Sequence, residues 1–456
     1  MSVDPLHFIK RNLLYLAICA LCLFSGARPA LAEVAPALDM EQAIILALAH
    51  NQDLLIAADQ VHDGEISTRL QRDQFLPAIS ADGSATVRHD AGAVDGDRNY
   101  DSLAADITLR LNLFNGFGDQ AALEAARQTL AARKHSYSRE EQQLVFTTIG
   151  NYLEAVRTLE QIQVAEQDLR DNELQLADIE AYYRAGRRPI TDVYLQKAET
   201  ARARSALLSA RRDYLVSKLT LLQTIGIDAT ATVEVVMPDH SLLKTVPETD
   251  AAALVATALV RRPDLQASQK EVAAAGEQIR VAKSGAYPVL DLAASTGTSY
   301  DGRNDEHFGS QMREDNFKAS LGLSLSVPIF DRNLSRHQVS QAMIAGNSAR
   351  LEVTKLQRRI EVEIGQAVAD YRTANEQLEV ARAQLTYAES ALESTEKRYQ
   401  VGAATLTELT SARSVYIEAR YALIEAEIDR MVQTVAIAFY SGDLDTTLFS
   451  QPKEHS

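Results

Sequence analysis

Apolar and polar residues alternate at every second position in one segment of the chain, from Leu103 to Leu113. Its odd positions are all apolar, whereas its even positions include Asp106, Thr108 and Arg110. Successive side chains of a β-strand point to opposite faces, so this segment predicts a strand with one apolar face and one polar face.

The same alternation recurs from Phe317 to Val327, with Lys318 and Ser324 on the polar side, and more weakly at 79–87 and 290–300. Segments of about ten residues with this pattern are typical of outer-membrane barrels, in which one face meets lipid and the other a water-filled lumen. Soluble sheets alternate too, so the pattern alone leaves both open. We expect four strands, at 78–88, 103–114, 289–300 and 317–328.

Long helices are the second prediction. An uninterrupted helical pattern without proline runs from Gly118 to Arg184, which corresponds to about 100 Å at 1.5 Å per residue. A second helix carries apolar or small residues at alternating steps of three and four, which is a heptad seam. The seam contains Ile364, Ala367, Tyr371, Ala374, Leu378, Ala381, Leu385, Ala388, Leu392, Thr395 and Tyr399. Without the strands, an ordinary dimeric coiled coil would be the preferred interpretation.

The chain contains one unit written twice. Asn51-Gln52-Asp53-Leu54 matches Arg262-Pro263-Asp264-Leu265 at an offset of 211, and Gly226 matches Gly442 at an offset of 216. The five extra residues fall in the loop that joins the second strand pair. We therefore expect repeats at 33–244 and 245–456, each with a helix, two strands and a long helical hairpin, forming one intertwined domain. The hairpin turns are expected near 185–190 and 401–405.

The N-terminus predicts export. Lys10 and Arg11 precede an apolar run, and Ala30-Leu31-Ala32 offers a signal-peptidase site, so residues 1–32 are expected to be a signal peptide. Both cysteines, Cys19 and Cys22, lie in that segment. The mature protein would then have no disulfide and no thiolate metal site.

Charge and motifs argue against nucleic acid binding and catalysis. The net charge of −16 disfavours nucleic acid, because binding its backbone requires lysine and arginine. The nine histidines show no metal-binding spacing, and the chain has neither a P-loop nor a Gly-x-Ser-x-Gly motif. We expect no catalytic residues, no metal and no cofactor.

Closure of the sheet sets the expected oligomer. A four-stranded sheet in outer-membrane lipid would leave the backbone groups of both edges unsatisfied, at several kcal/mol each. Two copies would give eight strands, whose side chains fill the interior, whereas three give twelve and leave an open lumen. The expected assembly is a homotrimer whose lumen is lined by Asp106, Thr108, Arg110, Lys318 and Ser324.

In the order and spacing of these features, the chain resembles the TolC-type outer-membrane efflux proteins. The likeness covers nearly all of the mature chain and includes Arg261-Arg262-Pro263-Asp264-Leu265 at the start of the second copy. It implies a mainly α-helical trimeric channel-tunnel, with a β-barrel in the outer membrane and an α-helical barrel in the periplasm. It also implies a periplasmic adaptor and an inner-membrane pump as partners.

The resemblance further implies a periplasmic gate built from Asp192, Tyr399 and Glu408. The chain departs from the best-known members at Ala404, where they have arginine, and at Ser411, where a second acidic ring would lie. Arg187 and Arg188 could substitute. The alternative is that Asp192 and Glu408 only favour the positive ends of their helices.

The hairpin tips, with Gly186, Arg187 and Gly402, are the expected adaptor-docking surface, unless these residues serve only the turns and solubility. The predicted function is a passive exit duct of tripartite efflux or type I secretion. Two alternatives remain, a periplasmic adaptor and a surface coiled-coil protein without a channel. The sequence leaves open the exported substrate and whether the pump uses protons or ATP.

Overall fold

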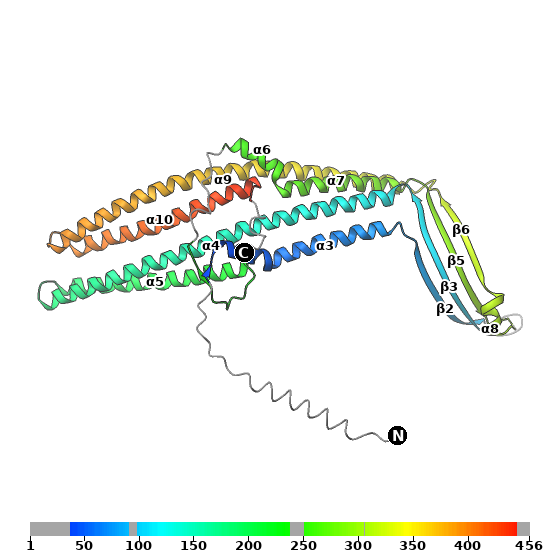
Figure 1. Ribbon diagram of the computed structural model, residues 1–456, viewed down its shortest axis with the longest axis horizontal. Helices are drawn as coiled ribbons and strands as arrows, with labels where there is room; N and C mark the ends of the chain where they lie inside the picture. Colours follow the sequence, from blue (N-terminus) through cyan, green and yellow to red (C-terminus); the bar gives the residue numbers. More distant parts are fainter. Residues whose placement is uncertain (1–36, 91–97, 238–249, 305, 445–456) are drawn as a thin grey trace, which may run out of the picture.

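The computed structural model describes residues 37–90, 98–237, 250–304 and 306–444. The molecule is elongated, with a curved β-sheet at one end and two helical hairpins that extend away from it (Figure 1). The predicted signal peptide, residues 1–32, lies outside the described residues. No described helix is both long enough and apolar enough to cross a membrane.

The first half of the chain forms two short helices, two strands and a long hairpin. Its elements are α2 (Met40–His50), α3 (Gln52–Asp73), β2 (Ala78–Asp90), β3 (Arg98–Asn115), α4 (Gly118–Arg184) and α5 (Ile190–Thr224). The two-residue strands β1 (Ala37–Leu38) and β4 (Glu234–Val235) pair in parallel near the middle of the molecule.

The second half repeats this order. Its elements are α6 (Ala251–Arg261), α7 (Pro263–Ser284), β5 (Val289–Asp301), α8 (Phe308–Ser310), η2 (Gln311–Asp315), β6 (Lys318–Ser326), α9 (Leu334–Gln400) and α10 (Leu406–Ser441). Corresponding helices have nearly equal lengths, since α2 and α6 have 11 residues, α3 and α7 have 22, α4 and α9 have 67, and α5 and α10 have 35 and 36.

The long helices carry the core. Helix α4 spans the predicted range, and the predicted seam of α9 is buried or half-buried along most of its length. In α4, Tyr183, which lies 216 residues before Tyr399 of the seam, is instead 43% exposed. The sequence of the seams, in which small alanines alternate with larger side chains, allows neighbouring helices to pack closely.

Each long helix packs against different partner helices in two successive stretches. Helix α4 packs against α3 and α7 near the sheet and against α5 farther away, while α9 packs against α7 and then α10 (Figure 1). A large apolar cluster lies where these stretches meet and includes Ile44, Tyr152, Leu221 and Met431. The Tyr152 hydroxyl donates a hydrogen bond to the Leu38 carbonyl (2.9 Å), which ties this core to β1.

The four long strands form one antiparallel sheet in the order β2-β3-β5-β6. Leu109 lies between Ile79 and Ala294, whereas Thr108 lies between Ser80 and Ser295. Because directly paired residues share a face, the register gathers the apolar positions on one face and the polar positions on the other. The predicted fold class, a mainly α-helical protein with long helices and a four-stranded β portion, is confirmed.

Some boundaries differ from those expected. Strand β3 begins at Arg98 rather than at residue 103, because the polar residues 98–102 pair with β2 although their sequence does not alternate. Strand β6 covers only Lys318–Ser326, and the nearby Pro328 cannot donate a strand hydrogen bond. The loop expected between β5 and β6 contains two short helical pieces, α8 and η2.

The turn of each hairpin contains a glycine that follows the end of the long helix. Gly186 and Gly402 have φ angles of +70° and +77°, a left-handed conformation that other residues adopt only at a cost. No other atom lies within 4 Å of the position of a Cβ at either glycine, so only the backbone conformation selects for it. Pro189 precedes the first residue of α5 with an extended backbone.

Candidate channel lining and hairpin-tip site

The five residues expected to line the lumen lie on one face of the sheet. Asp106, Gly297 and Lys318 occupy one row across β3, β5 and β6. Ser324 pairs with Asp291 of β5, which is itself paired with an even-numbered position of β3. The even-numbered positions of β3 share this face, so Thr108 and Arg110 lie on it with Asp106.

This polar face is held by contacts between side chains. The Asn112 amide donates to the Asp291 carboxylate (2.9 Å), and the hydroxyls of Ser295 and Ser320 are 2.8 Å apart. A Cβ on Gly297 would lie 2.0 Å from Asp106 Oδ1, so the carboxylate folds over the glycine. The glycine therefore provides the space that this acidic side chain occupies.

The opposite face of the sheet is apolar and uncovered in the single chain. Among its large side chains, Ile79, Leu321 and Leu323 are 68%, 76% and 64% exposed. A continuous apolar surface of this kind fits a lipid environment.

At the hairpin tips, Arg188 connects the two hairpins. Its guanidinium lies 3.7 Å from the Asp192 carboxylate at the start of α5. The guanidinium carbon also lies 4.5 Å from the centroid of the Tyr399 ring near the end of α9. Both ion-pair partners are largely covered, at 26% and 20% exposure, so solvent screens this pair less than an open surface pair. The sequence identified Arg188 only as a possible substitute.

Tyr399 is buried between the hairpins. It packs with Ile179 from α4, Val193 from α5 and Leu409 from α10. Its hydroxyl makes no hydrogen bond among the described residues. Burial raises the pKa of Tyr399; the charge of Arg188 opposes this rise and the carboxylate of Asp192 adds to it.

Glu408 is bound by its own helix end. Its carboxylate accepts hydrogen bonds from the Thr405 backbone (2.6 Å) and hydroxyl (3.0 Å), while the Thr405 hydroxyl accepts one from the Glu408 backbone. These bonds, aided by Arg398, lower the pKa of Glu408. The structure therefore brings Asp192 and Tyr399 together but turns Glu408 back onto Thr405.

A groove of about 540 Å³ lies beside these tips. Arg187 and Gly402, from the two turns, both line it, together with Asp178, Tyr182 and Glu396. Gly186 is not part of its lining and lies at the outer turn.

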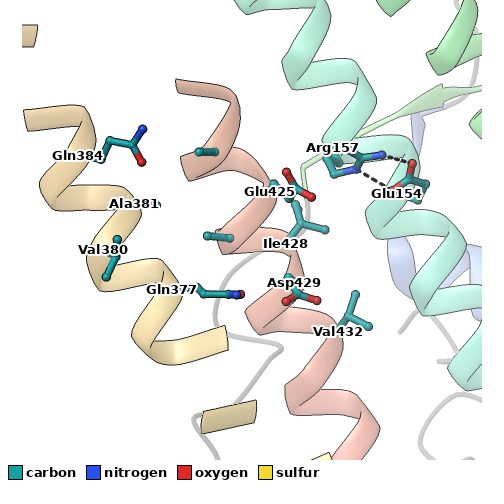
Figure 2. Close-up of a pocket in the computed structure, with 12 residues that line it drawn as sticks. Glu154, Arg157, Gln377, Val380, Ala381, Gln384, Glu425, Ile428, Asp429 and Val432 are labelled. Carbon is teal, nitrogen blue, oxygen red and sulfur yellow. Dashed lines mark hydrogen bonds and ion pairs between the residues drawn. The ribbon is translucent and has the colours of Figure 1, made fainter. Parts of the chain in front are cut away.

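A second groove of about 660 Å³ lies farther from the tips, between α4, α9 and α10. Figure 2 shows Arg157 and Glu154 of α4 opposite Glu425 and Asp429 of α10, with Gln384 of α9 on the other side of α10 in this view. Arg157 Nε donates to Glu154 Oε2 at 2.7 Å. No sequence pattern indicated this groove, because its residues look like ordinary polar positions on helices.

Among the described residues, no three His, Cys, Asp or Glu side chains gather closely enough to hold a metal ion. A model of the family described as "Outer membrane efflux protein" matches residues 43–227 and 254–443. The chain belongs to the outer membrane efflux protein family. The resemblance to TolC-type proteins is thereby confirmed.

Individual relatives agree with this assignment. The chain is 24% identical over 359 residues to the outer membrane efflux protein BepC of Brucella suis, and the match covers 76% of this chain and 75% of BepC. It is 27% identical over 419 residues to the protein CyaE of Bordetella pertussis, covering 91% and 86%. The Campylobacter jejuni CmeC outer membrane channel superposes with a TM-score of 0.78 at 15% identity, covering 90% and 88%, and so shares the fold.

As a member of the outer membrane efflux protein family, the chain is an outer-membrane exit duct for efflux or secretion, with its tunnel in the periplasm. The family consists of channels rather than enzymes. Its members form trimeric channels that work with periplasmic adaptors and inner-membrane pumps.

Proposed function

We propose that three copies of this chain close one twelve-stranded barrel and continue it as a helical tube, through which substrates leave passively. The support comes from the two sheet edges. Strands β2 and β6 each have a partner on one side only. Within lipid, each unpaired backbone group costs several kcal/mol, and pairing β6 of one copy with β2 of the next removes both edges.

The polar face of the sheet forms the barrel lumen in this assembly. Asp106, Thr108, Arg110, Lys318 and Ser324 line it, and the apolar face with Leu109 and Leu323 meets lipid. The common face of these polar residues in the register supports the assignment.

Neighbouring residues of opposite phase test the barrel. Leu109→Arg and Leu323→Arg place charge in lipid at a cost of about 2–4 kcal/mol per substitution near the bilayer centre, so assembly should fail. Thr108→Arg and Ser324→Arg, one residue away from each, should still assemble and should change conductance.

The measurements are heat-modifiable migration of the detergent-extracted trimer and single-channel conductance in planar bilayers. Equal loss of trimer for both members of each pair would reject the strand phase. A water-soluble monomer would reject the channel itself.

The gate is proposed to lie at the tips, where Arg188 binds Asp192 and the Tyr399 ring and so holds one hairpin against the other. This arrangement takes the place of the arginine that the resemblance implies at the position of Ala404. Glu408 contributes a charge rather than a link, because its lowered pKa keeps it ionised. Three copies of Glu408 around the axis would attract cations and repel anions.

The gate proposal is tested by removing the link. Arg188→Ala combined with Asp192→Asn should raise the conductance of the closed channel, whereas Arg187→Ala should leave it unchanged. Unaltered conductance in the double variant, with trimer assembly intact, would reject the gate.

The adaptor is proposed to dock on the tips formed by Gly186, Arg187 and Gly402. Support comes from the groove that Arg187 and Gly402 share. Arg187→Glu should reduce co-purification of the cell's own periplasmic adaptor and inner-membrane pump after cross-linking. Arg212→Glu makes the same charge change at an exposed position of α5 away from the tips, and it serves as the control. If Arg187→Glu and Arg212→Glu co-purify equal amounts of adaptor and pump, docking at the tips is rejected.

A further inference from the structure

Two short helical pieces, α8 and η2, lie between β5 and β6 at the end of the sheet farthest from the helices (Figure 1). Strand β6 stops pairing with β5 at Gly297, whereas β5 continues to Asp301. The final stretch of β5 therefore has a free edge beyond the end of β6.

Two amide side chains of the loop take over that edge. Gln311, which is fully buried, accepts a hydrogen bond from the Asp301 backbone nitrogen (3.0 Å) and donates to the Glu306 carbonyl (2.9 Å). The Asn316 side chain donates to the Ser299 carbonyl (2.7 Å). The segment Phe308–Asp315, formed by α8 and η2, is thereby anchored beside β5.

Contacts with two β5 side chains show which face the segment covers. The Thr298 hydroxyl donates to the Met312 carbonyl (2.9 Å), and the Tyr300 and Phe308 rings are 5.2 Å apart. Thr298 pairs with Ala105 and Tyr300 with Leu103, so both are in phase with the apolar face. The helical segment lies on the face that we assign to lipid.

The start of the same loop turns to the other face. Arg303 binds Asp301 (2.7 Å), and its guanidinium carbon lies 4.6 Å from the centroid of the Tyr100 ring. Asp301 pairs with Ser102, and Tyr100 pairs with Arg88, all on the polar face. The loop thus sends Arg303 toward the lumen side and Phe308 toward the outside.

The height of the segment matches the edge of a bilayer. From Leu290 to Tyr300 the strand rises about 25 Å along the membrane normal, given about 3.3 Å per residue and a tilt of roughly 40°. This equals the height of the apolar band of outer-membrane barrels. Phe308 and Phe317, which are 51% and 62% exposed, lie with Tyr300 at this boundary, where aromatic side chains are favoured.

We propose that Phe308–Asp315 binds the outer surface of the membrane, with Phe308 inserted at the boundary between headgroups and acyl chains, rather than folding across the pore mouth. The partner surface is lipid, because the exposed Phe308 ring packs on Tyr300 and so continues the apolar face of the sheet outward. Its exposed charges, Arg313, Glu314 and Asp315, would face the headgroups and water. The inference rests on the proposed strand phase.

The chain contains no tryptophan, so single tryptophans report their own surroundings. Phe308→Trp is the test variant, Phe317→Trp the lipid-facing control and Ser324→Trp the lumen-facing control. Each trimer is reconstituted into phosphatidylcholine vesicles whose acyl chains are brominated near the headgroup. Fluorescence is compared with unbrominated vesicles and titrated with iodide. Met312→Trp provides a second reporter if Phe308→Trp does not assemble.

We expect F308W to emit at shorter wavelength than S324W and to lose fluorescence to brominated lipid about as strongly as F317W, with little quenching by iodide. Quenching of F308W by iodide alone would place the segment over the pore mouth and overturn the inference. Protection from both quenchers would place it between protomers and overturn it too. If F317W and S324W respond alike, the strand phase itself fails, which separates that failure from failure of this inference.

Discussion

The two halves of the chain have helices of matching length, yet the junctions between their short helices differ. In the first half, Asn51 separates α2 from α3, accepts a hydrogen bond from the Leu54 backbone (3.0 Å) and donates to the Thr224 carbonyl (2.9 Å). In the second half, the corresponding residue is Arg262, which is only 2% exposed. The neutral junction links α3 to α5, within one half of the chain.

The charged junction links more elements. Arg262 binds both oxygens of Asp264, at 3.0 and 2.6 Å, and reaches Glu363 on α9 at 2.5 Å. Nearby, Arg139 of α4 donates to the Phe439 carbonyl on α10 (3.1 Å), and burial together with the charge of Arg262 lowers the pKa of Arg139 to about 10. The junction in the second half of the chain thus connects more structural elements than the corresponding junction in the first half.

Replacement of the two junction residues should give the largest contrast. Arg262→Ala removes the buried guanidinium that binds Asp264 and Glu363, and although Glu363 keeps its ion pair with Arg359 (3.5 Å), breaking a buried pair costs about 3–5 kcal/mol. Asn51→Ala loses a helix cap, at about 1 kcal/mol. The temperature at which the detergent-resistant trimer dissociates should fall much further for R262A. Similar shifts for the two variants would contradict the asymmetry.

The glycines after α5 and α10 should give the opposite contrast, with the larger loss of stability in the first half of the chain. Gly226 and Gly442 have φ angles of +72° and +74°, so alanine costs about 1–2 kcal/mol at either position. A Cβ on Gly226 would also lie 2.4 Å from the His50 carbonyl oxygen, against 3.0 Å from the Arg262 nitrogen for Gly442.

The same dissociation measurement should therefore show a larger loss for Gly226→Ala than for Gly442→Ala. Gly150→Ala, inside α4 with no atom within 4 Å of the added carbon, is the control and should be neutral or stabilising. A larger loss of thermal stability for G442A would mean that the backbone near Arg262 adjusts less to the added carbon than the backbone near His50 does.

The hairpin turns give the smallest contrast. Helix α10 starts with the capping box of Thr405 and Glu408, whereas α5 starts after Pro189 without a side-chain cap. Thr405→Ala should cost about 1 kcal/mol and speed amide hydrogen exchange in the first turn of α10. Pro189→Ala should have little effect on exchange in the first turn of α5.

The capping box also makes the second turn sensitive to acid. The pKa of Glu408 lies below its ordinary value of 4.5 in the folded protein, so its stabilisation is present above that value and is lost as pH falls through the folded pKa. The protection factors of the amides in this turn, which correct for the intrinsic pH dependence of exchange, should therefore fall below about pH 4.5 and should do so less in T405A. An equal acid response in both proteins would contradict the role of the box.

Much of the fold could be predicted because its signals are long and periodic. The bounds of α4 follow from an unbroken helical pattern between Gly118 and Arg184, and the sheet phase follows from alternation around Leu109. The short helical pieces between β5 and β6 could not be predicted, because Gln311 and Asn316 form them through contacts with the distant end of β5.

The hairpin-tip site was predicted only in part. The Thr405-x-x-Glu408 spacing is itself a capping-box signature and could have shown that Glu408 binds its own helix end. The position of Arg188 over Tyr399 depends on how two hairpins about 200 residues apart in sequence, roughly the repeat offset, pack together. No local pattern contains that information.

Helices α4 and α9 run without a break for 67 residues each. The number of residues in these helices therefore sets how far the tunnel extends from the outer membrane toward the pump, at about 1.5 Å per residue. Seven residues inserted at one level of all four hairpin helices would preserve the packing faces and lengthen the reach by about 10 Å. Coupling to a pump would then depend on the distance between the two membranes of the envelope.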